Sequence, residues 1–212
     1  VTVTEYLTAV YMDALARIHE EQVQTRLRPR RHVLRVEIPV NMRRFYASQT
    51  MRNFSLFVMP EIDLRLGRYD FEEILRAVHH AMRTQLAKKQ LGRQISRNVA
   101  GERNPVVRII PLFLKDWYLS FLHDRLGDNL YSGVISNLGP VAMPEAMREH
   151  VADVGFVLGP NPNLKKNLAV AGLGDRISLT FGSVIEDRSL ERLVFRTMVA
   201  HGIPVTVSER GA

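Results

Sequence analysis

Two long helix patterns enclose two short strand patterns in the first half of the chain, and this arrangement limits the fold more than any other feature. Apolar residues recur at helical spacing over residues 3–23 and 71–93, whereas residues 33–40 and 54–59 form short, strand-like apolar segments. Helix and strand patterns that alternate along a chain indicate helices layered on a sheet. We therefore expect an α/β chain with helices flanking a β-sheet.

The second half adds further strand patterns and a hairpin. Gly174 and Asp175 form a two-residue turn signal between two of these patterns. Because some strands are joined by a hairpin and others by helices, the sequence predicts an α/β (α+β layered) chain with a mixed β-sheet. The expected strands cover residues 131–137, 152–158, 167–173, 176–183 and 205–207, and the expected helices begin at Pro111 and cover 188–201.

Local signals place several boundaries. Thr2 with Glu5, and Asp70 with Glu73, have the spacing of capping boxes that begin helices. Residues 94–105 are polar, so we expect an irregular segment there. The helix after Pro111 is expected to bury an apolar face that includes Leu114, Trp117 and Phe121.

The chain is basic, with 29 Lys and Arg against 22 Asp and Glu and a formal net charge of +7. The positive residues gather over residues 26–31 and 83–108. This pattern is typical either of an ordinary soluble surface or of a surface that attracts a phosphate-bearing partner. Neither stretch is interleaved with aromatic residues, which weakens the case for single-stranded nucleic acid.

Several kinds of chemistry are excluded by what the sequence lacks. With no cysteine, the chain has no disulfide, no thiolate nucleophile and no cysteine metal site. The seven histidines do not have metal-ligand spacing, and there is no phosphate-binding loop. No apolar run approaches the roughly 20 residues that span a bilayer, so we expect no membrane span and a cytoplasmic protein.

Five segments, taken in order, resemble the chloramphenicol acetyltransferase-like superfamily, and more closely the C-terminal half of bacterial alcohol-acetyltransferase-like and condensation-type proteins. These segments are Ile38–Phe45, Arg52–Phe54, Phe71–Ile74, Ser136–Val141 and Gly202–Val205. The resemblance implies that residues 1–212 form a single domain, the C-terminal lobe of a longer two-lobed protein. Its partner would be the missing N-terminal lobe, with the active site in a tunnel between the lobes.

The resemblance also implies the chemistry. An acyl group would pass from a thioester, carried by CoA or by a carrier protein, to a hydroxyl or amine acceptor, with no tightly bound cofactor. The base would be the second histidine of a His-His-x-x-x-Asp-Gly motif. His79 and His80 are followed by Ala-Met-Arg-Thr-Gln and lie within a helix pattern, so we expect structural histidines and no catalytic residue in this chain. The lobe should not catalyse alone.

Six polar residues are candidates for the tunnel wall, because strand ends are where α/β proteins place ligands. They are Asn41, Arg43, Arg52, Asn53, Ser136 and Asn137. By resemblance, Ser136 or Asn137 could stabilise a developing oxyanion and the others could contact the phosphates of CoA. The alternative interpretation of these residues is turn capping and solvated charge.

Two arrangements would distinguish the hypotheses. A tunnel wall should bring Asn41, Asn53 and Asn137 onto one concave face. A non-catalytic interaction module, binding protein or nucleic acid through the basic 83–108 stretch, should instead leave Arg93 and Arg97 on an exposed patch. An isolated lobe would also expose apolar surface, which predicts a homo-oligomer.

Overall fold

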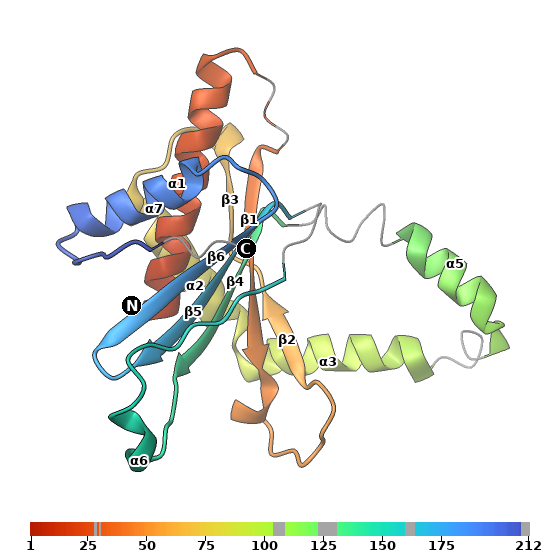
Figure 1. Ribbon diagram of the computed structural model, residues 1–212. Coiled ribbons are helices and arrows are strands. Elements are labelled where there is room, and N and C mark those ends of the chain that lie inside the picture. The colour runs from red at the N-terminus through yellow and green to blue at the C-terminus, as the bar shows by residue number, and fades with distance from the viewer. Residues whose placement is uncertain (28, 30, 104–108, 123–130, 160–163, 209–212) are drawn as a thin grey trace.

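The computed structural model describes residues 1–212 except residues 28, 30, 104–108, 123–130, 160–163 and 209–212 (Figure 1). In chain order, the elements are α1 (Val3–Gln24), β1 (Val33–Asn41), the 3₁₀ helix η1 (Met42–Arg44), β2 (Ser55–Val58), β3 (Glu61–Asp63), η2 (Leu64–Leu66), α2 (Phe71–Gln85), α3 (Lys88–Arg103), α5 (Leu112–Leu122), β4 (Gly133–Pro140), α6 (Glu145–Arg148), β5 (Lys166–Leu173), β6 (Arg176–Ser183) and α7 (Ser189–Ala200).

The strands form one mixed sheet, which confirms the predicted fold class. Its order is β2-β1-β4-β5-β6, and β3 pairs with the first residues of β1. The β1–β4 and β4–β5 pairs are parallel, whereas β1–β2 and β5–β6 are antiparallel. The β5–β6 hairpin turns at Gly174, as predicted, where the left-handed backbone (φ 59°) suits glycine.

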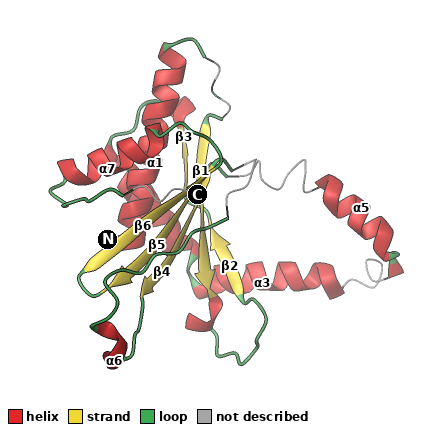
Figure 2. Cartoon of the chain, viewed as in Figure 1, coloured by secondary structure: helices red, strands yellow, loops and turns green. Residues whose placement is uncertain are grey.

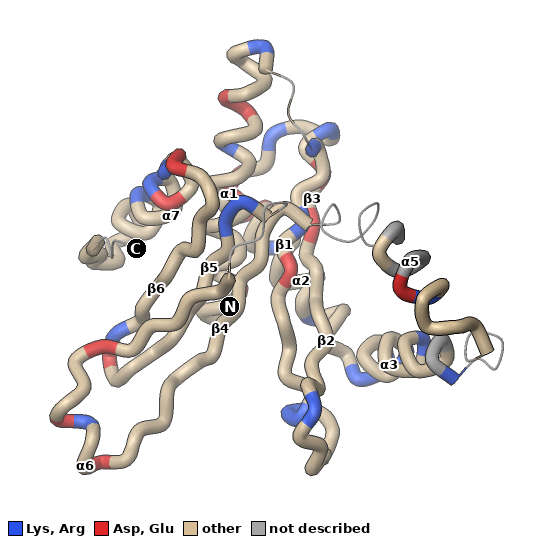
Figure 3. The backbone as a smooth tube through the Cα atoms, turned by 45° about the vertical axis from the view of Figure 1, so that its right-hand side comes forward, with Lys and Arg blue, Asp and Glu red and all other residues tan. Residues whose placement is uncertain are grey.

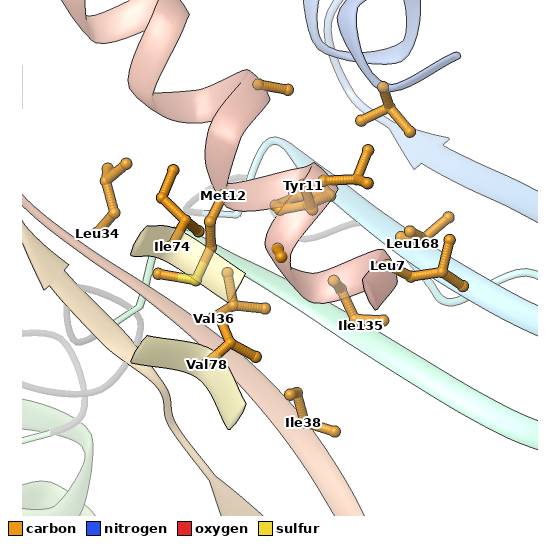
Figure 4. Close-up of a cluster of buried hydrophobic side chains, with 14 of the residues drawn as sticks. Leu7, Tyr11, Met12, Leu34, Val36, Ile38, Ile74, Val78, Ile135 and Leu168 are labelled. Atoms are coloured by element: carbon orange, nitrogen blue, oxygen red, sulfur yellow. The ribbon is translucent and has the colours of Figure 1, made fainter. Parts of the chain in front are cut away.

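The hydrophobic core lies between one face of the sheet and the helices α1, α2 and α7 (Figure 1). Figure 4 shows Leu7 and Tyr11 of α1 clustered with Val36, Ile135 and Leu168, which come from three adjacent strands. Helix α1 has its ten buried residues between Glu5 and Ala16, because this part of the helix lies at the centre of the layer. Both predicted capping boxes are present, at Thr2 with Glu5 and at Asp70 with Glu73.

The middle of the chain differs from the prediction in two places. No element was predicted between the strand pattern at 54–59 and the helix pattern at 71–93, but β3 and η2 lie there and are too short to leave a periodic pattern. The expected helix 71–93 ends at Gln85, and α3 continues to Arg103 through the segment expected to be irregular. Among the described residues of α3, the apolar side chains that pack against Met42 and Leu56 are Leu91 and Ile95, so the sequence of this helix carries little of the apolar periodicity that identifies a helix.

Other strand and helix predictions are wrong in detail. Residues 152–158 and 205–207 join no ladder, although the first segment runs extended beside β5 and β6 (Figure 2). Helix α5 begins near the predicted residue, yet Leu114 is 45% exposed rather than buried. The side chains of Trp117 and Phe121 lie outside the described part of the chain. None of the described helices is long and apolar enough to cross a bilayer.

Candidate functional site

The face of the sheet opposite the helices is the candidate binding surface. Residues that pair across strands share a face, so Ile38 and Val58 lie in the core while their neighbours Pro39 and Phe57 lie on the opposite face. We call that opposite face the open face. Phe57 is exposed on it.

A segment without regular structure covers the open face at β5 and β6. The Asn167 side-chain amide donates a hydrogen bond to the Gly159 carbonyl oxygen at 3.2 Å. A Cβ on Gly182 would lie 2.6 Å from the Leu158 carbonyl oxygen, so this segment and β6 are in close contact. Because residues 151–159 occupy that half, the accessible part of the open face belongs to β1, β2 and β4 (Figure 2).

Four of the six candidates lie together in the loop between β1 and β2. Asn41 caps η1 by accepting a hydrogen bond at its Oδ1 from the Arg43 backbone N–H at 3.0 Å. The Arg43 guanidinium donates to the carbonyl oxygens of Thr50 (2.7 Å) and Arg52 (2.9 Å). The Asn53 Oδ1 accepts from the Ser55 hydroxyl at 2.9 Å. These contacts build the loop, as the turn-capping interpretation expected.

The other two candidates are neighbours on β4, yet they face opposite sides of the sheet. The Asn137 amide donates to the Thr4 hydroxyl of α1 at 3.0 Å, and its Oδ1 accepts from the Gly139 N–H at 2.8 Å. Ser136 pairs with Ala169 and is half-buried on the open face. The structure therefore brings Asn41 and Asn53 together and directs Asn137 toward the helices, away from them.

The sheet also separates at the candidate site. Strands β1 and β4 pair at Val36 with Gly133 and at Glu37 with Val134. Beyond these pairs the strands diverge toward their carboxyl ends (Figure 1). The β1–β2 loop and the carboxyl end of β4 thus lie on two arms of a splayed sheet, at the edge where parallel strands usually present ligand-binding groups.

His79 has an acidic partner, but on the helical side of the sheet. Its Nδ1 lies 3.2 Å from Oε1 of Glu5, and the histidine side chain is 31% exposed. Burial alone would raise the pKa of Glu5, but hydrogen bonds from the Thr2 backbone and from His79 hold that pKa below its ordinary value. Because α1 and α2 provide this pair, it stabilises helix packing and lies on the wrong side of the sheet for a substrate on the open face.

A buried polar network under α1 and α7 could not be predicted from the sequence. The Lys166 ammonium group contacts the Glu191 carboxylate and the Asp187 carbonyl oxygen. The Tyr11 hydroxyl donates to the Lys166 carbonyl oxygen at 3.1 Å, and burial raises the pKa of Tyr11. Lys166 falls in a strand pattern and Glu191 in a helix pattern, so only their three-dimensional packing reveals the pair.

Two further features bear on the kind of site. Among the described residues, no cluster of three histidine or carboxylate side chains could hold a metal ion. A hollow of about 530 Å³ lies at the β5–β6 turn and α6, lined partly by Val141, Met143, Arg148 and Arg176, and none of the six candidates lines it.

No family model and no curated protein matches the sequence, but solved structures resemble the fold. A variant of the starter condensation domain of the rhizomide synthetase RzmA aligns with a TM-score of 0.51 at 12% identity, over 93% of this chain and 41% of that one. The chain has the fold of one lobe of a condensation domain. It spans about two-fifths of that structure's length.

Two other structures give weaker alignments. The epimerization domain from the third module of tyrocidine synthetase B aligns at a TM-score of 0.48 and 11% identity, over 94% of this chain and 41% of that one. The wax ester synthase/diacylglycerol acyltransferase from Marinobacter aquaeolei VT8 aligns with a TM-score of 0.44 at 14% identity, over 96% of this chain and 44% of that one.

Proposed function

We propose that this chain is one lobe of a two-lobed acyltransferase, and that its open face forms one wall of the cleft in which the acyl group is transferred. The donor is a thioester of CoA or of a carrier protein, and the acceptor is a hydroxyl or an amine. The observation that carries the proposal is the condensation-domain fold, which accounts for 93% of this chain and leaves more than half of the matched structure for another lobe.

In this proposal the chain binds and positions substrates, while the second lobe provides the base. The open-face positions of β1, β2 and β4 hold no histidine: they are Arg35, Glu37, Pro39, Asn41, Ser55, Phe57, Val134, Ser136 and Leu138. The His79 imidazole is held by Glu5 between two helices. The lobe therefore does not catalyse acyl transfer alone.

The candidate residues divide into two roles. Ser136 is half-buried on the open face, where its hydroxyl can donate a hydrogen bond to a developing oxyanion. Arg52 is exposed on the β1–β2 loop, where its guanidinium can pair with a phosphate of CoA. Asn41, Arg43 and Asn53 shape the loop that presents Arg52. The Asn137 amide bonds Thr4 of α1, so in this proposal Asn137 holds β4 in place and does not itself contact a substrate.

A thermal-shift titration with CoA tests the donor site. At a CoA concentration ten times the dissociation constant, binding stabilises the folded state by about 1.4 kcal/mol. For a chain of this size that corresponds to a rise in Tm of roughly 3–6 °C. Arg52→Gln should remove most of the shift, whereas Arg196→Gln, an exposed arginine on α7, is the matched control and should keep it.

Three outcomes would contradict the proposal. An unchanged Tm at millimolar CoA would refute a CoA site in this lobe, and an equal loss in both variants would refute the placement at Arg52. Since the chain has no cysteine, a thiol reagent measures released CoA without background from the protein. Release of CoA from acetyl-CoA by the chain alone would refute the assignment of the base to a second lobe.

The interaction module remains the second candidate, because α3 presents Lys89, Arg93 and Arg97 as exposed side chains. Residues 104–108 of the basic stretch lie outside the described residues. Binding of protein or nucleic acid through 83–103, together with no response to CoA, would favour this function over acyl transfer.

A further inference from the structure

The end of the molecule formed by the β1–β2 loop and residues 88–101 of α3 is rich in basic residues and has no Asp or Glu in its sequence. No Asp or Glu occurs between Asn41 and Pro60 or between Ile74 and Gly101. Over the same two stretches the basic residues are Arg43, Arg44, Arg52, Arg76, Arg83, Lys88, Lys89, Arg93 and Arg97. Figure 3 shows basic positions on the β1–β2 loop and on α3 at the same end of the molecule.

Packing holds these two segments together at this end of the molecule. Leu91 of α3 is fully buried against Met42 and Leu56, and the Tyr46 hydroxyl donates to the Lys88 carbonyl oxygen at 3.3 Å. On the opposite side of α3, Lys89, Arg93 and Arg97 recur every four residues, which places them in one row about 6 Å apart along the helix axis. We call this row the α3 basic row.

Apolar side chains accompany the charge. Met51 is 98% exposed, and Arg43 donates to the carbonyl oxygens of both flanking positions, Thr50 at 2.7 Å and Arg52 at 2.9 Å. These contacts fix the backbone on either side of Met51. Helix α5, beyond the outer end of α3 in Figures 1 and 3, exposes Leu112 (72%) and Phe113 (70%).

We propose that this end of the molecule docks on an anionic lipid bilayer, with the α3 basic row against the headgroups and Met51 inserted at the interface. Exposed apolar side chains beside clustered cations are what a peripheral membrane surface requires. A surface for single-stranded nucleic acid would instead place exposed aromatic side chains among the cations. In the β1–β2 loop beside α3, however, Phe45, Tyr46 and Phe54 pack partly buried against the small cluster of Met42, Leu56 and Leu91. The inference is independent of acyl transfer.

Cosedimentation of the whole chain with vesicles tests the proposal. We expect binding to phosphatidylcholine vesicles that contain phosphatidylserine, weaker binding as salt is raised, and little binding to pure phosphatidylcholine. Because each cation near such a surface changes affinity about fivefold, Lys89→Gln/Arg93→Gln/Arg97→Gln should weaken binding on the order of a hundredfold. Met51→Ser should weaken it about tenfold.

The matched control removes the same charge elsewhere. Arg148→Gln/Arg176→Gln/Arg196→Gln changes three exposed arginines on α6, β6 and α7, and should retain most of the affinity. Far-UV circular dichroism checks that each variant is folded. The comparison between vesicles with and without phosphatidylserine uses the unaltered chain, so it tests the proposal even if a variant fails to fold.

Each contrary result is decisive. Equal binding to both kinds of vesicle, or an equal loss in the control triple, would overturn the proposal. Binding of a single-stranded oligonucleotide without binding of anionic vesicles would also overturn it, and would assign the surface to nucleic acid.

Discussion

Gly133 begins β4 beneath the buried ring of Tyr11, and substitution by alanine should strongly destabilise the chain. A Cβ at this position would lie 2.4 Å from Tyr11 Oη, 2.7 Å from Cε1 and 2.8 Å from Cζ. The ring must therefore move, and overpacking of a core typically costs about 1–3 kcal/mol. Movement also withdraws the hydroxyl from the Lys166 carbonyl oxygen, 3.1 Å away, which adds about 1–3 kcal/mol for an unsatisfied buried group.

Urea denaturation followed by circular dichroism should thus show that Gly133→Ala lowers the free energy of unfolding by about 2–6 kcal/mol with an unchanged slope. Gly159→Ala is the matched control, because a Cβ there meets nothing within 4 Å. Like Gly133→Ala, this substitution lowers the backbone conformational entropy of the unfolded chain, and it should change the free energy of unfolding by less than about 1 kcal/mol.

Tyr11→Phe in the Gly133→Ala background should recover little stability, because two ring carbons remain too close. A loss below about 1 kcal/mol for Gly133→Ala would refute the close approach of Tyr11 to β4. Full recovery by Tyr11→Phe would show instead that the hydroxyl alone causes the clash.

Three further predictions concern other polar contacts. Lys166→Met leaves the Glu191 carboxylate buried without its lysine partner, with the Arg188 guanidinium 4.0 Å away. Urea denaturation should therefore show a loss of about 3–5 kcal/mol, and adding Glu191→Leu should restore most of it. The pKa of Glu5 is lowered in the folded state, so the ionised Glu5 carboxylate stabilises the fold fully above its ordinary pKa of 4.5. This stabilisation is lost as the pH falls below that value. Glu5→Gln should therefore reduce the loss of folding free energy that is measured on acidification. Asp70→Ala removes the cap of α2 and should cost about 1 kcal/mol in thermal unfolding, and no change would show that the capping box is not formed.

Features set by neighbouring residues could be predicted from the sequence. The capping boxes at Thr2 and Asp70 and the hairpin turn at Gly174 depend on side chains within three residues of each other, so the sequence contains the whole cause. The mixed sheet also followed, because hairpin and helical connections alternate along the chain.

Features set by distant residues could not be predicted. The sequence showed residues 152–158 as a strand, because an extended segment lying across a sheet has the same apolar pattern as one paired within it. The last residue of α2, Gln85, accepts a hydrogen bond at its Oε1 from the Met59 backbone N–H at 2.7 Å, a contact between segments 26 positions apart that the sequence does not reveal. The grouping of Asn41 with Asn53 followed from the hairpin-like β1–β2 connection, whereas the direction of Asn137 depended on contact with Thr4, 133 positions away.

The alternation of side chains along β4 decides which of its polar residues lies on the open face. A shift of one residue along the sheet would exchange Ser136 and Asn137 between the open face and the helices. Three contacts on the helical side oppose that shift: Gly133 lies under Tyr11, Ile135 is fully buried in the core, and the Asn137 amide bonds Thr4. The glycine that makes room for Tyr11 therefore also keeps Ser136 on the open face. A side chain at Gly133 would disturb the candidate site through the position of β4, without touching any residue of the open face.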